Sequence, residues 1–499
     1  MKFKRFLLLA TVLTFVLGCA PAIQSNPVPI VSLNREIKET LLTEIDYSSW
    51  LPGSLLLSPN WQKIVYVNKA AGKQVVVVNG KEEKRYEQIS TQSLRFSQDS
   101  QRLAYVVYAQ DKLLAVIDGQ EGKPYDDIGF GTPIFSRDSK SVAYTALEGE
   151  KWFIVVDGQE GKRFDLIVPG SVKFTADSKE IAFVARIGSK MVYQVGDKGG
   201  SPYDEIQEGS LVLSPDGRHV AYAAREGNRW FVVRDETAEK KYDEIKLGSV
   251  VFSPDSQRLA YVAKSGDKWF VVLDGKESQA YDAADVGKYS FSSDGKRFAY
   301  AARIGQKGVV VRDGKEEKQY TGIGIGSLTF SPDNQRLAYV AALKMCEHSD
   351  AEREKDIKAH QAEDEICVVV DGREGKVYTL IGGPPIFSPD SKHLAYSVWM
   401  KDGWYLVKDG IEYPQKHDAI APATFAFSAD SNHVAYVAKS GDKWHVAVDG
   451  QAGKQYSGII TMFGGKIVFD SADHLRYIAV DGGKILLVEE QISEQPVKP

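Results

Sequence analysis

The chain has 499 residues, of which 43% are hydrophobic and 26% are charged, and its formal net charge at pH 7 is −5. This is the composition of a globular protein and excludes the disordered and collagen-like classes. The excess of acidic residues argues against a nucleic-acid partner, for which a basic face is expected.

The N-terminus, residues 1–18, has the pattern of an export signal peptide. Basic residues are followed by the apolar run Phe6–Leu17, which is too short to span a bilayer comfortably. The run ends in Val16-Leu17-Gly18-Cys19, which resembles the lipobox of bacterial lipoproteins. The resemblance implies lipid attachment at Cys19 and anchoring in the bacterial cell envelope, and Ala20 favours the outer membrane facing the periplasm. Plain secretion with an incidental cysteine is the alternative.

Three segments are expected after the signal peptide. Residues 19–39 are expected to be the lipidated cysteine and a tether, because Ala20–Asn34 is polar, contains proline and lacks periodicity. Residues 40–488 are predicted to form an array of repeats, and residues 489–499 a polar tail. The array carries most of the chain, so its repeat unit decides the fold.

The repeat unit is clearest in Ser249–Asp282. Its apolar and β-branched runs predict strands at 249–253, 258–263 and 268–274, with a last short strand around Tyr281. Ser-Pro-Asp-Ser, Ser-Gly-Asp and Asp-Gly turns separate these strands. The second and third strands are apolar throughout rather than alternating, which indicates burial on both faces.

The unit recurs with a constant spacing. The Ser or Thr of the first turn recurs every 39 residues in eight units, two more units follow, and a degenerate eleventh surrounds Phe469–Val488. A period near 40 with four strands per unit predicts an all-β fold, a β-propeller of about eleven four-stranded blades. The first-turn markers are Ser58, Ser97, Ser136, Thr175, Ser214, Ser253, Ser292, Ser331, Ser388 and Ser428.

The stretch F-S-P-D-S-Q-R-L-A-Y, residues 252–261, is similar to the WD40-like, TolB-type (PD40) propeller repeat. The resemblance covers about residues 50–488, although no copy ends a strand with the Trp-Asp of true WD40 repeats. It implies a propeller, and little about function, because propellers serve as binding platforms, peptidase gates and enzymes.

The number of rings and their closure are separate questions. Propellers usually have four to eight blades, so two rings of five and six are expected in preference to one oversized ring. The last unit shows three strands, and Leu41–Asp46 resembles the outer-strand segment Tyr242–Ile245. The N-terminal segment is therefore predicted to supply a fourth strand that closes a ring and removes its exposed edges.

The eighth unit contains an insertion, residues 344–364, between its second and third strands. The sequence from Ser349 predicts a short helix, and the insertion is either a working arm or a tolerated solvated loop. Cys346 follows the second strand and Cys367 opens the third, and a disulfide between them is predicted for an exported chain. A metal site made with His348 and His360, and free thiols, are the alternatives.

Aromatic and cationic side chains recur where the third strands begin. They form either a recognition surface or, as the sequence favours, packing between blades. The tryptophans are Trp152, Trp230, Trp269, Trp404 and Trp444, and Lys151, Arg229, Lys268 and Lys443 precede four of them.

The sequence predicts no catalytic residue, metal or cofactor, because it contains no nucleophile elbow, phosphate loop or dinucleotide fingerprint. The Asp residues of the first turns, such as Asp216 and Asp255, are interpreted as turn formers. The leading interpretation is a lipid-anchored envelope propeller that binds a protein or polysaccharide partner. The alternative is a propeller enzyme, such as a lyase, glycosidase or peptidase-related protein, with a site built from inter-blade loops at the channel mouth.

Overall fold

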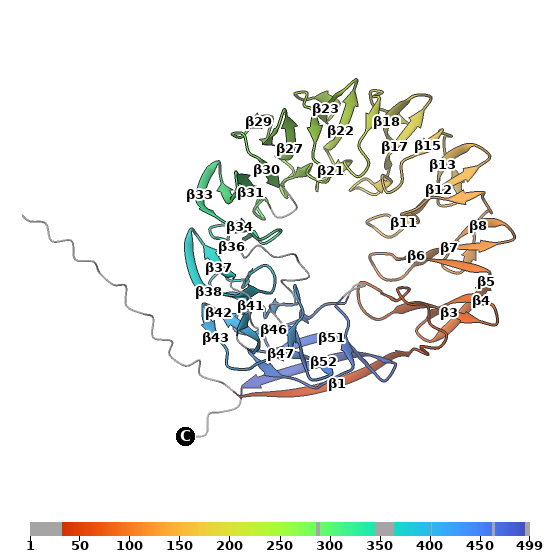
Figure 1. Ribbon diagram of the computed structural model, residues 1–499. Coiled ribbons are helices and arrows are strands. Elements are labelled where there is room, and N and C mark those ends of the chain that lie inside the picture. The colour runs from red at the N-terminus through yellow and green to blue at the C-terminus, as the bar shows by residue number, and fades with distance from the viewer. Residues whose placement is uncertain (1–31, 286–289, 345–363, 401, 462–464, 495–499) are drawn as a thin grey trace, which may run out of the picture.

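The computed structural model describes residues 32–285, 290–344, 364–400, 402–461 and 465–494. These residues form 52 strands, β1 to β52, in eleven antiparallel sheets. The sheets follow one another around a ring in chain order (Figure 1). No helix of the described residues is long and apolar enough to cross a membrane. The all-β propeller predicted from the repeat is therefore confirmed.

Each sheet is one blade, and we number the blades one to eleven by their second strands. These are β3 (Ile64–Ala70), β7 (Leu103–Ala109), β12 (Val142–Glu148), β17 (Ile181–Ile187), β22 (Val220–Glu226), β27 (Leu259–Ser265), β31 (Ala299–Ile304), β36 (Leu337–Lys344), β41 (Leu394–Met400), β46 (Val434–Ser440) and β51 (His474–Asp481). The third strands are β4 (Lys73–Val78), β8 (Lys112–Ile117), β13 (Lys151–Val156), β18 (Lys190–Val195), β23 (Arg229–Arg234), β28 (Lys268–Leu273), β32 (Lys307–Arg312), β37 (Glu365–Val370), β42 (Gly403–Lys408), β47 (Lys443–Val448) and β52 (Lys484–Glu494).

Blade six shows how the repeat unit folds. Two short strands, β25 (Glu244–Ile245) and β26 (Val251–Phe252), both pair with β27, which pairs with β28 and then with β29 (Lys276–Glu277). Tyr281 bridges back to Trp269 at the outer edge, as predicted. The innermost strand differs from the prediction, because it begins at Glu244 and is broken in two. The segment Tyr242–Ile245 is therefore shared between the outer edge of blade five and the inner edge of blade six.

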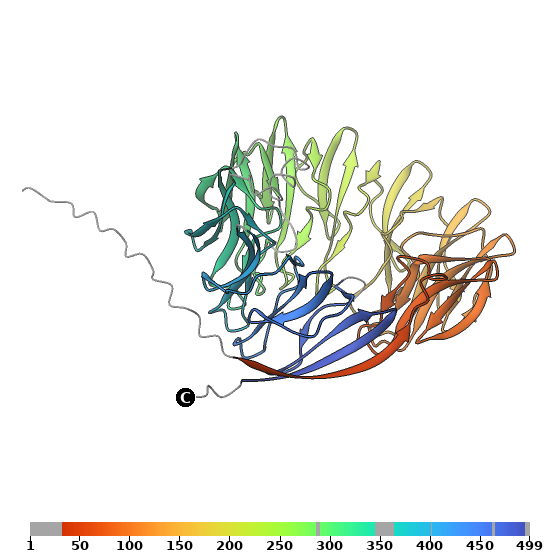
Figure 2. The same cartoon turned by 60° about the horizontal axis from the view of Figure 1, so that its bottom comes forward.

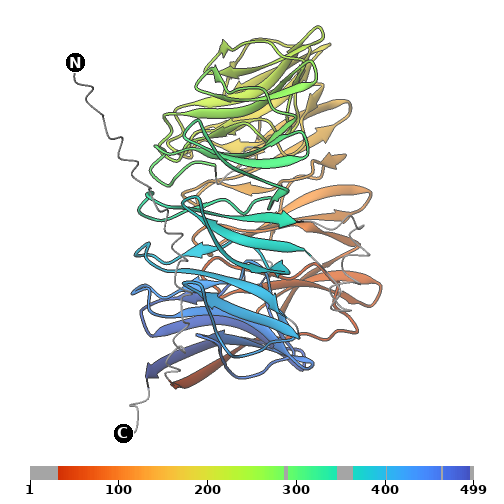
Figure 3. The same cartoon turned by 60° about the vertical axis from the view of Figure 1, so that its left-hand side comes forward.

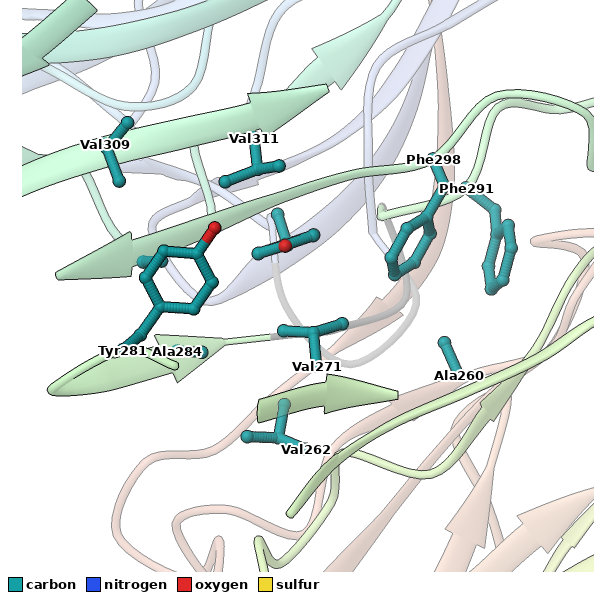
Figure 4. Close-up of a cluster of buried hydrophobic side chains, with 11 residues drawn as sticks. Ala260, Val262, Val271, Tyr281, Ala284, Phe291, Phe298, Val309 and Val311 are labelled. Atoms are coloured by element: carbon teal, nitrogen blue, oxygen red, sulfur yellow. The ribbon is translucent and has the colours of Figure 1, made fainter. Parts of the chain in front are cut away.

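The apolar central strands are buried on both faces because each blade lies between two others. In β27, Tyr261 and Ala263 pack in a cluster with blade five, whereas Ala260 and Val262 pack in a cluster with blade seven. Figure 4 shows the second cluster, in which Val271 also lies against residues of blade seven. This alternation explains why a strand without polar positions is stable here.

The ring is a single one. Eleven clusters of buried hydrophobic side chains join successive blades, and one of them joins blade eleven to blade one through Ile478, Ile485, Ile64 and Tyr66. The preference for two rings of five and six blades is therefore wrong. Two rings would need a pair of neighbouring blades without a shared cluster, and the described residues contain no such pair.

The N-terminal strand closes this ring, as predicted. Strand β1 (Leu33–Glu44) pairs antiparallel with β52 from Leu33 opposite Glu494 to Glu44 opposite Lys484. Figures 2 and 3 show the two strands side by side. The array thus extends beyond the predicted limits, residues 40 and 488, at both ends.

Candidate functional site

The innermost strand of a typical blade is interrupted by a turn. In blade six the turn is Lys246–Ser249, between β25 and β26, and Gly248 has a φ of +73° that favours glycine. The first strands of the sheets, such as β11 (Ile134–Phe135) and β21 (Val212–Leu213), lie on the inner side of the ring, whereas β29 and β33 (Lys315–Tyr320) lie outside (Figure 1). The turns therefore lie at the inner edge of the blades.

A serine or threonine hydroxyl fixes eight of the described turns. In blade six the Ser249 Oγ donates to the carbonyl of Lys246 at 2.7 Å and accepts the N–H of Val262 at 3.0 Å. The hydroxyl satisfies a buried backbone donor of β27 that the broken strand leaves unpaired. The same pair of hydrogen bonds is made by Ser54, Ser93, Thr132, Ser171, Ser210, Ser327 and Thr424.

Among the described inner turns, three expose a large apolar side chain. Phe130 is 70% exposed, Leu247 64% and Ile325 97%, and each precedes a turn glycine with positive φ. The three turns belong to blades three, six and eight, and apolar side chains exposed to this extent gain free energy when a partner covers them. We call these three residues the inner-turn residues. Sequence reasoning missed them, although alignment of the repeats six residues before each marker would have displayed them.

The five predicted tryptophans are half-buried rather than freely exposed. Each packs against a cluster between two blades, as Trp269 does between blades six and seven. A cation from the neighbouring second strand lies over three of the rings, for example Lys264 over Trp269 at 5.5 Å. A role of these rings in recognition stays a prediction.

The cations that precede the tryptophans are held by carboxylates. Lys268 Nζ lies 2.6 Å from an oxygen of Asp282, whose second oxygen accepts the N–H of Gly305 in blade seven at 2.6 Å. The Lys268 ammonium, with that N–H, holds the pKa of Asp282 below its usual value. Lys151, Arg229 and Lys443 are paired similarly, with Asp165, Asp243 and Asp481. These groups tie neighbouring blades together.

The other polar groups of the repeat are also engaged within the fold. Asp216 accepts hydrogen bonds from the Ser214 hydroxyl and the Arg218 N–H, which lower its pKa, so it forms the turn that the sequence predicts. His393 Nδ1 lies 2.6 Å from a carboxylate oxygen of Asp409. Within the described ranges no three His, Cys, Asp or Glu side chains converge as a metal site would require.

The predicted disulfide and lipid site involve residues outside the described ranges. Cys19, Cys346 and the helix expected from Ser349 belong to those residues, so these predictions remain open. Cys367 is fully buried in β37, between blades seven and eight, and burial raises the pKa of its thiol to about 11. At that pKa little thiolate forms at neutral pH, so a free thiol at this position reacts slowly.

Two buried histidines were not singled out from the sequence. His417 and His445 lie at the interface of blades nine and ten, with ring centroids 5.4 Å apart. His417 Nε2 is 2.9 Å from the Tyr436 hydroxyl, and neither ring nitrogen of His445 has a hydrogen-bond partner among the described residues. Burial lowers the pKa of each imidazole to about 4, so both are neutral at pH 7.

Comparison with known proteins finds only distant structural similarity. No protein-family model and no curated protein matches the chain. Among solved structures, a eukaryotic initiation factor matches 79% of this chain and 98% of its own, with 11% identity and a TM-score of 0.36. The Dos1 propeller matches 72% and 93% with 11% identity and a TM-score of 0.28. An oligogalacturonate lyase in complex with manganese matches 63% and 96% with 11% identity and a TM-score of 0.25. At these values no activity transfers to this chain.

Proposed function

We propose that this protein is a lipid-anchored binding module of the bacterial cell envelope, and that its propeller holds a partner protein at the inner turns. The observation that carries the proposal is the exposure of Phe130, Leu247 and Ile325 in the inner turns of one ring. Apolar side chains on a rigid platform gain free energy when a partner removes them from water.

The chemistry of these side chains favours a protein over a polysaccharide. Leu247 and Ile325 offer neither an aromatic face for stacking on a sugar nor a hydrogen-bonding group. Asp216, His393 and the cations that precede the tryptophans are engaged in turns and ion pairs, which supports binding rather than catalysis as the role of the ring.

The anchor would keep this platform close to a membrane. Cys19 precedes Leu33, the first residue of β1, by 14 residues. A fully extended segment of that length reaches about 50 Å at most. Attachment through β1 therefore joins the lipid to the outer edge of blade eleven and leaves the inner turns open to a partner.

The test replaces the three inner-turn residues together, as Phe130→Ser, Leu247→Ser and Ile325→Ser. A matched control carries Ile187→Ser, Val377→Ser and Ile411→Ser, which are 47%, 43% and 39% exposed but do not lie on inner turns. Exposed substitutions of this kind change stability by about 0.5 kcal/mol or less each, so both variants should fold.

The measurement is quantitative mass spectrometry of proteins captured from solubilised envelopes. We expect one set of proteins to be enriched by the parent and the control and lost with the inner-turn variant. Capture of the same set by all three would contradict the proposal. Retention of envelope polysaccharide by the parent and the inner-turn variant alike, with no protein enriched, would contradict it too and favour a sugar partner elsewhere on the ring.

A further inference from the structure

A cavity of about 280 Å³ lies between blades three and four, apart from the inner turns. Blade three contributes Ile154 and Phe164, and blade four contributes Phe174 and Phe183. Charged side chains, among them Lys162, line its opening. The volume is roughly at the lower end of the range of small-molecule pockets, and the apolar lining with few charges is typical of them.

The cavity lies at an interface where two side chains found at other interfaces are both absent. At three other interfaces a glutamate of one blade accepts a hydrogen bond from a tyrosine hydroxyl of the next. Between blades three and four the corresponding residues are Gly161 and Phe183, so both the carboxylate and the hydroxyl are absent. The pairs at the other interfaces are Glu83 with Tyr105 at 2.5 Å, Glu239 with Tyr261 at 2.6 Å and Glu317 with Tyr339 at 2.8 Å.

One charge at the opening has lost the partner that the repeat provides. In other blades the lysine at the position of Lys162 pairs with a glutamate of the next blade, as Lys123 does with Glu160 at 2.7 Å. Gly199 stands at the position of that glutamate in blade four. The ammonium of Lys162 keeps the other contact of the repeat and lies over the ring of Phe164, 5.8 Å from its centroid, as Lys123 lies over Tyr125.

A second charge, of opposite sign, stands at the wall of the same cavity. In blade six Arg258 pairs with Asp274 at 3.0 Å. The same two positions in blade four are Glu180 and Gly196, so the sign of the first is reversed and the second is uncharged. A carboxylate oxygen of Glu180 lies 2.8 Å from where a Cβ on Gly196 would be, which places it at the cavity wall.

We propose that this cavity binds a free aromatic amino acid. Its ring lies among the phenylalanine side chains, its carboxylate pairs with Lys162 and its ammonium pairs with Glu180. Aromatic packing provides the apolar contribution, and the two opposite charges match a zwitterion. The site takes a small molecule and is separate from the protein-binding role proposed for the inner turns.

The first experiment measures the affinity of the full-length protein for three probes by isothermal titration calorimetry. L-Tryptophan carries both charges, indole-3-propionate lacks the ammonium and tryptamine lacks the carboxylate. We expect L-tryptophan to bind at least about tenfold more tightly than either. Equal binding of one truncated probe, or no binding of L-tryptophan, would overturn the assignment.

The second experiment closes the cavity with residues that the repeat already uses. Gly161→Glu with Phe183→Tyr recreates the pair of the other interfaces and should abolish L-tryptophan binding. Gly375→Glu is the matched control between blades eight and nine, where Tyr396 is already present, and should leave binding unchanged. An added Cβ meets a backbone carbonyl at 3.1 Å at both glycines, so the substitutions are equally tight. Undiminished binding by the closed variant would refute the site.

If the closed variant fails to fold, exposed single variants decide the question. Lys162→Ala and Glu180→Gln should each weaken L-tryptophan binding by about tenfold, the effect of losing one charge-assisted hydrogen bond. Parent-like affinity in both would overturn the proposal. The inner-turn variant should bind L-tryptophan as the parent does.

Discussion

The interface of blades five and six and the interface of blades ten and eleven fill the same space, beside a buried tyrosine, with different side chains. Between five and six, Glu239 accepts the Tyr261 hydroxyl, and both residues come from the repeat. Between ten and eleven, Gly453 stands at the position of that glutamate, and Arg35 of β1 enters the space: a Cβ on Gly453 would lie 2.6 Å from its guanidinium.

Arg35 brings charge into the closing interface. Its guanidinium lies 2.5 Å from Glu490, whose side chain is fully buried and also accepts the Tyr477 hydroxyl at 2.5 Å. The regular interfaces have ion pairs between partly exposed side chains, such as Lys268 with Asp282, whereas the ring is closed by a buried ion pair joining residues 455 positions apart. Because a buried charge that loses its partner is strongly unfavourable, closure depends on Arg35 more than any regular interface depends on one residue.

The largest expected effect is that of Arg35→Ala. It leaves Glu490 buried without a cation and should lower the free energy of unfolding by about 3–5 kcal/mol. Glu239→Ala, which leaves only the Tyr261 hydroxyl without an acceptor, should cost about 1–3 kcal/mol. Urea denaturation of both variants makes the comparison. A larger loss for Glu239→Ala would reverse the ranking of the two interfaces.

A double variant separates charge from packing at the closure. Arg35→Met with Glu490→Met leaves no buried charge and should be more stable than Arg35→Ala, because apolar replacement of a buried ion pair is often neutral or favourable. If the double variant were no more stable than the single one, lost packing rather than the unpaired charge would explain the effect.

A smaller effect is expected from acid at the neighbouring interface of blades nine and ten. His417 and His445 have pKa values of about 4 in the fold, below the ordinary value near 6.5. The unfolded chain therefore binds more protons between these values, so stability that is present above pH 6.5 falls as the pH is lowered towards 4. At pH 4.5 the loss should be roughly 2 kcal/mol for each histidine.

His445→Phe tests that pH dependence with a residue the repeat already accepts, since Phe153, Phe231 and Phe270 occupy its position in other blades. The variant should lose less stability than the parent between pH 7 and pH 4.5. The measurement is the free energy of urea unfolding at both pH values. An unchanged pH dependence would show that His445 does not become protonated on unfolding in this range.

The smallest effect should be the same in a regular blade and near the closure. Ser249→Ala in blade six and Thr424→Ala in blade ten each leave one buried backbone N–H without an acceptor. Each should cost about 1–2 kcal/mol. Thermal unfolding of the two variants measures the loss of stability. A clearly larger loss in blade ten would mean that the inner turns near the closure also differ from those of a regular blade.

Local patterns in the sequence were sufficient to predict where the strands of each blade lie and that the central strands are buried on both faces. The turn residues around Ser253 and the unbroken apolar run Leu259–Ala263 determine strand positions and two-sided burial through short-range chemistry. The number of blades in one ring was not predictable in that way, because it depends on small angles between sheets that accumulate around the ring. The pairing of Arg35 with Glu490 likewise has no local signal.

The candidate sites likewise combine features that the sequence shows with features that only the structure shows. The hydroxyls that hold the inner turns and the change from tyrosine to Phe183 are visible once the repeats are aligned, so a comparison of copies could have found them. The exposure of Ile325 and the burial of both nitrogens of His445 follow from how neighbouring blades pack. Those features required the structure.

The central claim is that eleven blades form one ring closed by β1, and distances between spin labels test it most directly. The labels are placed in a lipid-free chain that carries Cys346→Ser and Cys367→Ala. One pair is Gln62→Cys in blade one with Asp473→Cys in blade eleven, and the second is Gln62→Cys with Gln257→Cys in blade six. Trp61 and Arg476, beside the first pair, are in contact across the closure, with the guanidinium 5.0 Å from the ring centroid.

A single ring predicts a short distance for the first pair, about 20–30 Å with the label arms included, because packed neighbouring sheets lie about 10 Å apart. It predicts a much longer distance for the second pair, whose blades lie on opposite sides of the ring (Figure 1). A long first distance together with a short second one would place blade one beside blade six and would contradict the single ring.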